Sequence, residues 1–263
     1  MLVAHRGGSL LAPENTVTAF RLATAVWWAD MLEMDARLTR DGHVVVMHDP
    51  SVDRTTNGTG PVAEHTLREI QALDAGYRFV DLAGRPSFRG QGVVVPTMEE
   101  VLMTFPDVRI TVECKEPGVA RPLADVVARL GAEDRVVIAA ESEASRRGAA
   151  GYRGPWGVSL RQGLVFWVLH RLPGGSPYTP TADIFQVPER WKGLRVVTPR
   201  FVREAQRLNL PVQVWTVNDP ADMRRLLEWG VDGIQTDRPD LLSRLLTELT
   251  GRPVPPGARA ASA

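Results

Sequence analysis

Three carboxylate side chains end short apolar runs in the first half of the sequence. Glu33 and Asp35 end one run, and Glu113 lies near the end of the run 109–115. Because side chains alternate along a strand, Glu33 and Asp35 share one face. Clustered negative charges repel one another unless a cation lies between them, and carboxylate oxygens suit Mg²⁺ or Ca²⁺ better than zinc. We expect Glu33, Asp35 and Glu113 to bind one of these divalent metal ions.

Two histidines end runs of the same kind and would lie beside that metal. His5 follows the first apolar run, and His48 ends the run that starts at His43. Imidazole titrates near neutral pH, so one of them suits the role of general base and the other that of general acid. Arg6 and Lys115 add positive charge that could hold a phosphate and stabilise charge on its oxygens in the transition state. Together these groups predict hydrolysis of a phosphodiester.

Each group also has a simpler interpretation when it is taken alone. His5 could be a hydrogen-bonded core residue, and His48 could be a surface residue in a turn. The carboxylates could pair with Arg37 or Arg6 in a structural ion-pair network. Two histidines beside three carboxylates at converging strand ends favour catalysis over these alternatives. The remaining histidines lack such neighbours and are not expected to be catalytic: His43, His65 and His170.

The residues that follow His5 also allow two interpretations. Asn15 is a strong helix cap and Glu14 suits the positive end of a helix dipole, so capping of the first helix is at least as good an account as contact with substrate. Gly7 and Gly8 permit a tight turn, and their missing side chains would let a phosphate approach the backbone. The two roles of the glycines are compatible.

Short β-branched runs alternate with helix-length amphipathic stretches along the chain. Strands that alternate with helices indicate βαβ units and a parallel sheet, and eight units in this length favour an α/β fold of the (β/α)8 TIM barrel type. In such a barrel all carboxyl ends of the strands meet, which would gather the chemical groups at one mouth. The expected strands are Leu2 to His5, Met31 to Asp35, Arg109 to Lys115, Val136 to Ala140, Trp156 to Leu160, Ala182 to Val187, Val212 to Val217 and Val231 to Thr236.

Turn and capping signals set further boundaries. The run 43–48 follows the turn 40–42, which predicts a hairpin return from the second strand. Thr97 and Glu100 form a capping-box pattern, and the stretch 218–230 carries a cap, an early proline and a terminal glycine. Both patterns predict helices.

We expect a single TIM-barrel phosphodiesterase domain over residues 1–250. The loop-rich segment of about residues 50–95 is predicted to be a small subdomain inserted after the second barrel strand, with a helix from Thr66 to Leu73. It would leave from the catalytic face and could cover the site. Residues 251–263 are rich in Pro, Gly, Ala and Arg, which predicts a disordered tail.

Composition restricts the class of protein. The 263 residues are 44% hydrophobic and 24% charged, which is ordinary for a globular protein with a sizeable core. Lysine plus arginine and aspartate plus glutamate both number 31, so no net charge favours nucleic acid or an anionic membrane. Cys114 has no disulfide partner in the chain, and the first residues resemble a buried strand rather than a signal peptide. We therefore expect a cytoplasmic protein with no transmembrane segment.

The run 164–169 is apolar on every side, and it lies after the fifth predicted strand between Arg161 and Arg171. The simpler interpretation is a fully buried barrel helix. The alternative is an interfacial or acyl-chain-binding element, with arginines at the level of lipid headgroups. That alternative would imply peripheral membrane contact and a lysophospholipid substrate.

Taken together, these motifs resemble the glycerophosphodiester phosphodiesterase family over nearly the whole chain. Their order and their places at strand ends make the resemblance specific, although each motif alone is weak. The motifs are His5-Arg6-Gly7-Gly8, Pro13-Glu14-Asn15-Thr16, Glu33-Met34-Asp35, His48-Asp49 with Arg54-Thr55-Thr56, Glu113-Cys114-Lys115, Trp215-Thr216-Val217-Asn218, and Gly233-Ile234-Gln235-Thr236-Asp237-Arg238-Pro239.

The resemblance implies the roles already given for the carboxylates, the histidines, Arg6 and Lys115. It adds Trp215 as a wall of the substrate pocket, where core packing is the simpler alternative. It also implies a route in which a glycerol hydroxyl attacks the phosphate, expels the alcohol and leaves a cyclic phosphate that water opens. Cys114 stands where we expect an aliphatic residue, and alternation points it away from the lumen. Gln186, near the end of the sixth predicted strand, could also reach the substrate.

The predicted function is metal-dependent hydrolysis of glycerophosphodiesters to glycerol 3-phosphate and an alcohol. A first alternative uses the same centre to convert lysophospholipids to lysophosphatidic acid, as a lysophospholipase D does. A second alternative is a non-catalytic phospholipid-binding barrel, which the complete set of catalytic groups disfavours.

Overall fold

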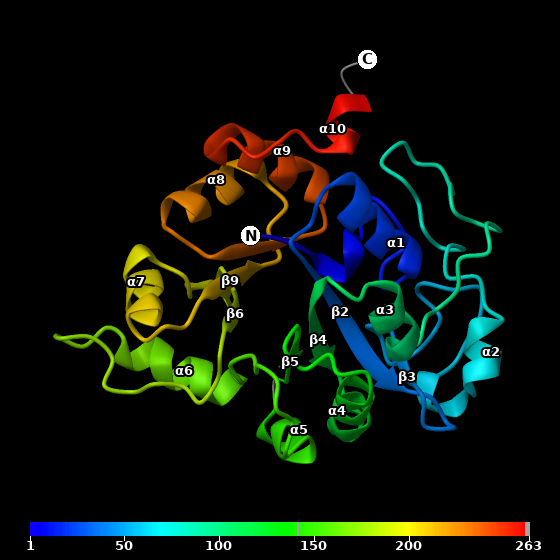
Figure 1. Cartoon of the computed structure of the whole chain (residues 1–263), viewed down its shortest axis with the longest axis horizontal. Helices are drawn as coiled ribbons and strands as arrows, with labels where there is room; N and C mark the ends of the chain where they lie inside the picture. The colour runs from blue at the N-terminus through cyan, green and yellow to red at the C-terminus, as the bar shows by residue number, and fades with distance from the viewer. Residues whose placement is uncertain (141, 261–263) are drawn as a thin grey trace.

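The computed structural model describes residues 1–140 and 142–260, and it forms a TIM barrel in which helices surround a curled parallel sheet (Figure 1). The parallel strands lie in the order β5-β4-β2-β1-β10-β9-β6. Their bounds are β1 Leu2–Ala4, β2 Met31–Leu38, β4 Arg109–Cys114, β5 Val136–Ala139, β6 Phe185–Pro188, β9 Val212–Trp215 and β10 Gly233–Thr236.

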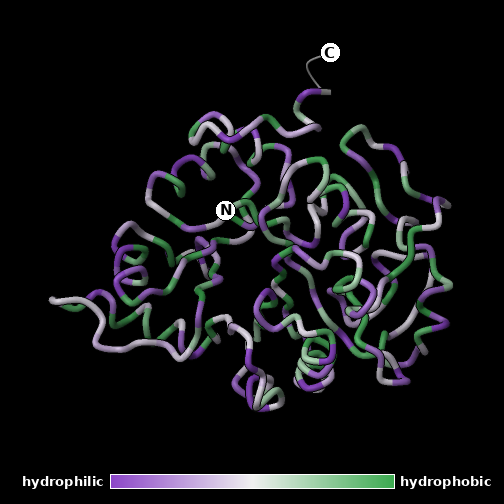
Figure 2. Tube along the Cα trace, viewed as in Figure 1, coloured by the Kyte–Doolittle hydropathy of each residue, from purple (hydrophilic) through white to green (hydrophobic). Residues whose placement is uncertain are grey.

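The helices of the surrounding layer are mostly short and begin at side-chain caps, and hydrophobic and hydrophilic stretches alternate along them (Figure 2). Their bounds are α1 Val17–Arg21, continued by a π-helical turn over Leu22–Val26, α3 Met98–Thr104, α4 Ala120–Arg129, α5 Glu143–Gly148, α6 Leu160–Leu169, α7 Pro199–Arg207, α8 Pro220–Glu228 and α9 Pro239–Thr250. Short 3₁₀ turns cover His5–Gly7, Val62–Glu64 and Pro117–Val119.

Seven of the eight predicted strands form, and the fifth is reduced to two bridge pairs. Trp156 pairs with Ile138 of β5, and Gly157 pairs with Ile184 just before β6, so this segment joins the two ends of the sheet. The predicted strand is shorter because the Ser159 hydroxyl already caps α6. A residue that starts a helix cannot extend a strand ladder.

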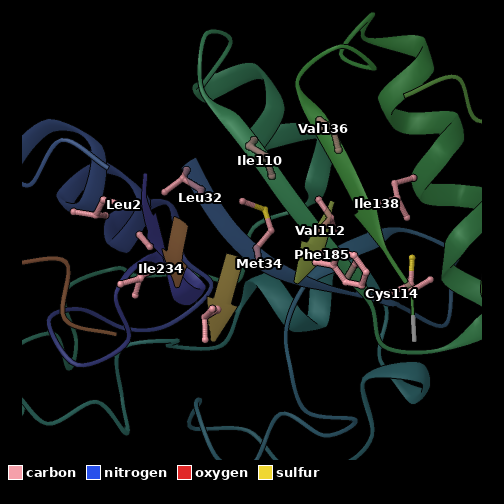
Figure 3. Packing of buried hydrophobic residues seen from close by; sticks show 14 of the residues in the cluster. Leu2, Leu32, Met34, Ile110, Val112, Cys114, Val136, Ile138, Phe185 and Ile234 are labelled. Atoms are coloured by element: carbon pink, nitrogen blue, oxygen red, sulfur yellow. The ribbon is translucent and has the colours of Figure 1, made fainter. Parts of the chain in front are cut away.

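The two faces of the strands have different surroundings. Side chains such as Leu32, Met34, Ile110 and Val112 point outward and pack in the main core beneath the helices (Figure 3). Cys114 lies in this core as expected, and burial raises the pKa of its thiol to about 12, which leaves it unsuited to nucleophilic chemistry.

The inward face of the sheet is apolar at its amino end. A small buried cluster of Val3, Met31, Val137 and Ile184 forms the floor of the lumen. Each strand places every second residue inside the barrel, and most of the inward residues nearer the carboxyl ends are polar.

The predicted hairpin return and caps are confirmed. Strand β3 (Val44–Val46) pairs antiparallel with β2. Thr97 and Glu100 form a complete capping box at α3, and Asp219 caps α8. These caps could be predicted from the sequence because a cap involves residues only two or three positions apart.

The segment 50–95 packs with Val45 and Met47 of the hairpin return in one small apolar cluster. Val52, Val62, Ile70 and Val93 belong to a cluster separate from the main core. Its helix α2 (Leu67–Gln71) is shorter than predicted at both ends and begins at a capping box formed by Thr66 and Glu69. A two-stranded hairpin elsewhere, β7 (Arg190–Trp191) with β8 (Leu194–Arg195), was not predicted.

The C-terminal segment differs from the predicted disordered tail up to residue 260, and residues 261–263 lie outside the described part. Arg252 forms a two-pronged ion pair with Asp30 at 2.9 Å, and helix α10 (Pro256–Ala260) follows. The backbone of Gly257 lies against Trp27, where an added Cβ would be 2.6 Å from the ring. Composition alone did not reveal these contacts because they involve residues more than 200 positions away. Among the described residues, no helix is long and apolar enough to span a membrane.

The turn after β1 depends on the absence of a side chain at Gly7. This residue has φ +84°, and an added Cβ would lie 2.7 Å from the Cβ of Ala19 in α1. We predict that Gly7→Ala destabilises the protein by about 3 kcal/mol, as the sum of left-handed strain and overpacking. Gly84→Ala is the matched control, because Gly84 has φ +78° and open space around it, and it should lose only about 1 kcal/mol. Urea denaturation measures both, and equal losses would show that the close approach is unimportant.

Candidate active site

The barrel brings the predicted site residues to one mouth. In the strand register Asp35 of β2 lies beside Glu113 of β4, and Glu33 lies one layer deeper beside Thr111. A cavity of about 430 Å³ opens there. Its lining includes seven of the eight predicted site residues: His5, Arg6, Glu33, His48, Glu113, Lys115 and Trp215. Asp35, the eighth, is 1% exposed directly behind them.

The three carboxylates can converge on a single ion. One oxygen from each of Glu33, Asp35 and Glu113 lies within 4.8 Å of the others. The ion pairs considered as an alternative exist only in part: Arg6 Nε lies 3.3 Å from Asp35, whereas Arg37 pairs with Glu116. Lys115, which that alternative did not include, has its Nζ 3.1 Å from Asp35 and 2.9 Å from Glu113. Within the described part of the chain, no lysine or arginine side chain forms an ion pair with Glu33.

The two buried carboxylates of β2 have opposite electrostatic environments. Burial, together with the charges of Asp35 and Glu113, raises the pKa of Glu33 to about 7. Burial acts in the same direction on Asp35, but the charges of Lys115 and Arg6 outweigh it and lower the pKa of that carboxyl. Among the described residues Glu33 therefore has no lysine or arginine partner, only His5 at 3.8 Å and the backbone amide of Arg6, and a divalent cation would compensate its charge.

His5 is oriented by an aspartate near the other end of the chain. Its Nδ1 lies 2.6 Å from Asp237 Oδ1, and its Nε2 lies 3.8 Å from Glu33. Burial disfavours the imidazolium, but the charge of Glu33 and the hydrogen bond to Asp237 outweigh it and raise the pKa of His5. The Asp237 carboxylate also accepts hydrogen bonds from Ser9 and Asn218. The sequence motif contained Asp237 but gave it no role, because the contact spans 232 residues.

His48 has an equivalent arrangement on the hairpin that returns from β2. Its Nδ1 lies 2.7 Å from Asp49 Oδ1, and Arg54 donates to both oxygens of Asp49. The hydrogen bond from Arg54 holds the pKa of Asp49 far below its usual range, and the bond to His48 adds to this. Arg54 also binds Glu14 at 2.8 Å, which ties the inserted segment to the loop after β1.

Glu14 and Asn15 do not cap the first helix. The side chain of Thr16 does so by accepting the amide of Ala19. Asn15 adopts φ +58° and its Nδ2 donates to Asp35 Oδ2 at 2.8 Å, so it orients a carboxylate of the site. Asparagine tolerates this left-handed conformation better than most residues.

A layer of amides separates the charged mouth from the apolar floor of the lumen. Gln186 Nε2 donates to Thr111 and to Gln213, each at 2.9 Å, and Gln213 in turn accepts from Gln235. Gln186 lines the cavity as its position suggested. Trp215 lines it too and is 38% exposed, so it is not a core residue.

Comparisons with known proteins agree on one family. The model of the Glycerophosphoryl diester phosphodiesterase family matches residues 5–142 and 165–241. The glycerophosphodiester phosphodiesterase of Caldanaerobacter subterraneus subsp. tengcongensis is 33% identical, over 94% of this chain and 97% of that protein.

Two solved structures give the same result for the fold. A glycerophosphodiester phosphodiesterase from Agrobacterium tumefaciens superimposes with a TM-score of 0.74 at 30% identity, covering 92% of this chain and 98% of that one. A phosphodiesterase from Oleispira antarctica, in complex with the product sn-glycerol-3-phosphate, has a TM-score of 0.72 at 20% identity, covering 94% and 96%.

Fold, site and similarity together define a TIM-barrel hydrolase of phosphoric diesters. The chain belongs to the glycerophosphoryl diester phosphodiesterase family, whose members hydrolyse glycerophosphodiesters.

The environment of Glu33 makes stability depend on pH in a defined direction. Its pKa rises from an ordinary 4.5 to about 7 in the fold, so between these values the folded state holds a proton that the unfolded chain releases. Stability therefore falls as pH rises through this window. In the presence of EDTA, we predict that the free energy of unfolding falls by a few kcal/mol across this window. Glu33→Gln should abolish that pH dependence. Mg²⁺ or Ca²⁺ should raise the wild-type melting temperature more at the upper end of the window than at the lower, and calorimetry that shows no difference would contradict this account.

Asp237 is predicted to act by positioning His5. Asp237→Asn keeps the shape but removes the charge that fixes the tautomer, so kcat should fall about 10²-fold or more with little change in KM. The limb of the pH–rate profile that reports His5 should move to lower pH, because the carboxylate raises the pKa of His5. Asp219→Asn is the control, since asparagine caps a helix equally well. A lower kcat with an unshifted profile would indicate a purely structural role.

Proposed function

We propose that this chain hydrolyses glycerophosphodiesters to glycerol 3-phosphate and an alcohol, with a divalent cation held by Glu33, Asp35 and Glu113. The observation that carries the proposal is the convergence of these carboxylates beside two aspartate-oriented histidines in one cavity. The glycerol 3-phosphate bound in the Oleispira antarctica structure, a product complex of that protein, supports the same choice of product.

The residues present fit a hard cation. All three ligands are carboxylates, and Glu33 is buried with no lysine or arginine in ion-pair contact among the described residues, its ion-pair partner being the imidazole of His5 at 3.8 Å. Such an ion, Mg²⁺ or Ca²⁺, would neutralise phosphate oxygens and polarise the phosphorus when bound. Asn15 and Lys115 hold Asp35 in place from either side, which fixes one ligand before the ion arrives.

His5 and His48 transfer protons on either side of the phosphate. One accepts the proton of the attacking oxygen, and the other donates a proton to the oxygen of the leaving alcohol. Asp237 and Asp49 each bind the Nδ1 of their histidine, so in both cases Nε2 is the nitrogen left to act.

The remaining predicted residues serve the substrate. Arg6 and Lys115 line the cavity and carry positive charge toward it, although both already contact Asp35. They bind the phosphate oxygens and stabilise their charge as the leaving bond lengthens. Trp215 forms the wall against which the glycerol or alcohol moiety packs.

The test is release of choline or ethanolamine from glycerophosphocholine and glycerophosphoethanolamine in the presence of Mg²⁺, Ca²⁺ or EDTA. We predict metal-dependent turnover that EDTA abolishes. His5→Ala and His48→Ala should each lower kcat by about 10²-fold or more, as expected for loss of an acid or a base.

His43→Ala is the matched control, because its exposed imidazole lies outside the cavity lining. It should leave kcat unchanged. If both His5→Ala and His48→Ala turn over substrate at the wild-type rate, the assignment of these histidines as acid and base is refuted. Absence of turnover with either metal would instead favour a non-catalytic phospholipid-binding barrel.

A further inference from the structure

The cavity at the active site has two chemically different ends. Charged groups such as His5, Glu33 and Lys115 line one end. The other end extends over α6 and the β7–β8 hairpin, and its lining is apolar: Val158, Leu160, Leu164, Trp167, Trp191 and Leu194. A ligand whose phosphate lies at the carboxylates would therefore continue into an apolar groove.

Helix α6 presents one side to this groove but is not buried, which corrects the expectation of a fully buried helix. Leu160, Gly163, Leu164 and Trp167 line the cavity at helical spacing. Leu160 is 53% exposed and Leu164 40% exposed. Large apolar side chains are thus open to solvent in the groove itself, where a bound apolar group would cover them.

The hairpin forms the opposite wall. Trp191 and Leu194 are a cross-strand pair, 40% and 55% exposed, joined by a turn in which Lys192 and Gly193 both have positive φ. This backbone is that of a tight two-residue hairpin turn. Trp167 Nε1 donates to the carbonyl of Arg195 at 3.4 Å, which links α6 to the hairpin.

Gly163 keeps the groove open. Glycine is disfavoured in a helix interior relative to alanine, so its presence in the middle of α6 calls for a reason. Close packing is not that reason, because an added Cβ would meet only Val158 Cγ1, at 3.6 Å. The missing side chain instead leaves space in the cavity that Gly163 lines.

We propose that this groove, resting on the proposed phosphodiesterase function, binds the acyl chain of a lysophospholipid. The walls complement an acyl chain, because the side chains of α6 and the hairpin that line the cavity are apolar and neither element carries an acidic residue. Leu160, Gly163 and Leu164 lie outside the ranges that the family model matches, whereas Trp167, Trp191 and Leu194 lie inside the range 165–241.

The reaction would be hydrolysis at the headgroup side of the phosphate. The bond from phosphorus to the headgroup oxygen breaks, and the oxygen of water forms the new bond to phosphorus. One proton of that water passes to the leaving alcohol, so choline and lysophosphatidic acid are the products from lysophosphatidylcholine. The acyl chain remains on the glycerol in the groove throughout.

The experiment compares choline release from glycerophosphocholine with release from lysophosphatidylcholines of short, medium and long acyl chain, below their micelle concentrations. The wild-type kcat/KM should rise with chain length. Gly163→Leu, which fills the groove, should lower kcat/KM for the long-chain substrate by about tenfold, or about 1.4 kcal/mol, and shift the preference to shorter chains. Turnover of glycerophosphocholine should stay within about twofold, which also shows that the variant folds.

Leu164→Gln and Val168→Gln form a matched pair on α6. Val168 is 57% exposed but is not part of the cavity lining. Only Leu164→Gln should reduce turnover of the long-chain substrate. Equal losses of long-chain turnover in both variants would contradict acyl-chain binding in the groove and would indicate a general contact with a lipid surface.

Failure of this inference is distinct from failure of the proposed function. If glycerophosphocholine is turned over and kcat/KM for the lysophosphatidylcholines does not depend on chain length, acyl-chain binding in the groove is refuted. The proposed phosphodiesterase function then still stands. No turnover of any of these substrates with Mg²⁺ or Ca²⁺ would overturn both.

Discussion

Electrostatic repulsion among three carboxylates at one end of the barrel is the constraint on which this structure depends. Glu33 is buried and has a raised pKa, whereas Asp35 pairs with Lys115 and Arg6, and Glu113 pairs with Lys115. The apolar core beneath the helices must supply the stability that this charged mouth reduces. The same imbalance suits the site to a divalent cation, because a bound ion would balance the negative charge of Glu33.

Rigid neighbours hold the reactive groups around that charge. Each histidine has an aspartate on Nδ1, and each of those aspartates has further donors of its own. The layer of glutamines below the mouth fills the lumen with mutually bonded amides. Side chains held by fixed hydrogen-bond partners need little reorganisation when substrate arrives, which favours catalysis by preorganised charge.

The second half of the barrel gives the cavity a different character. The ends of β1, β2 and β4 and the hairpin return after β3 carry its ionisable groups, whereas α6 and the β7–β8 hairpin carry apolar ones. The short bridge segment at Trp156 and Gly157 lets α6 begin early, directly at the mouth. The catalytic groups and the groups that select the substrate can thus vary independently, because different strand–helix units of the barrel carry them.

The sequence by itself determined the barrel, the helix caps, the hairpin after β2 and the identity of the candidate site residues. Those features depend on alternation along strands and on contacts within a few residues, which are periodic and local. Only the tertiary structure decided that Asp237 orients His5, that Asn15 orients Asp35 and that Arg252 anchors the C-terminal segment to Asp30. Their partners are far apart in the chain or differ in role from what local capping rules suggest. The exposure of α6 also needed the fold, because an apolar run looks the same in sequence whether a core or an open groove lies beside it.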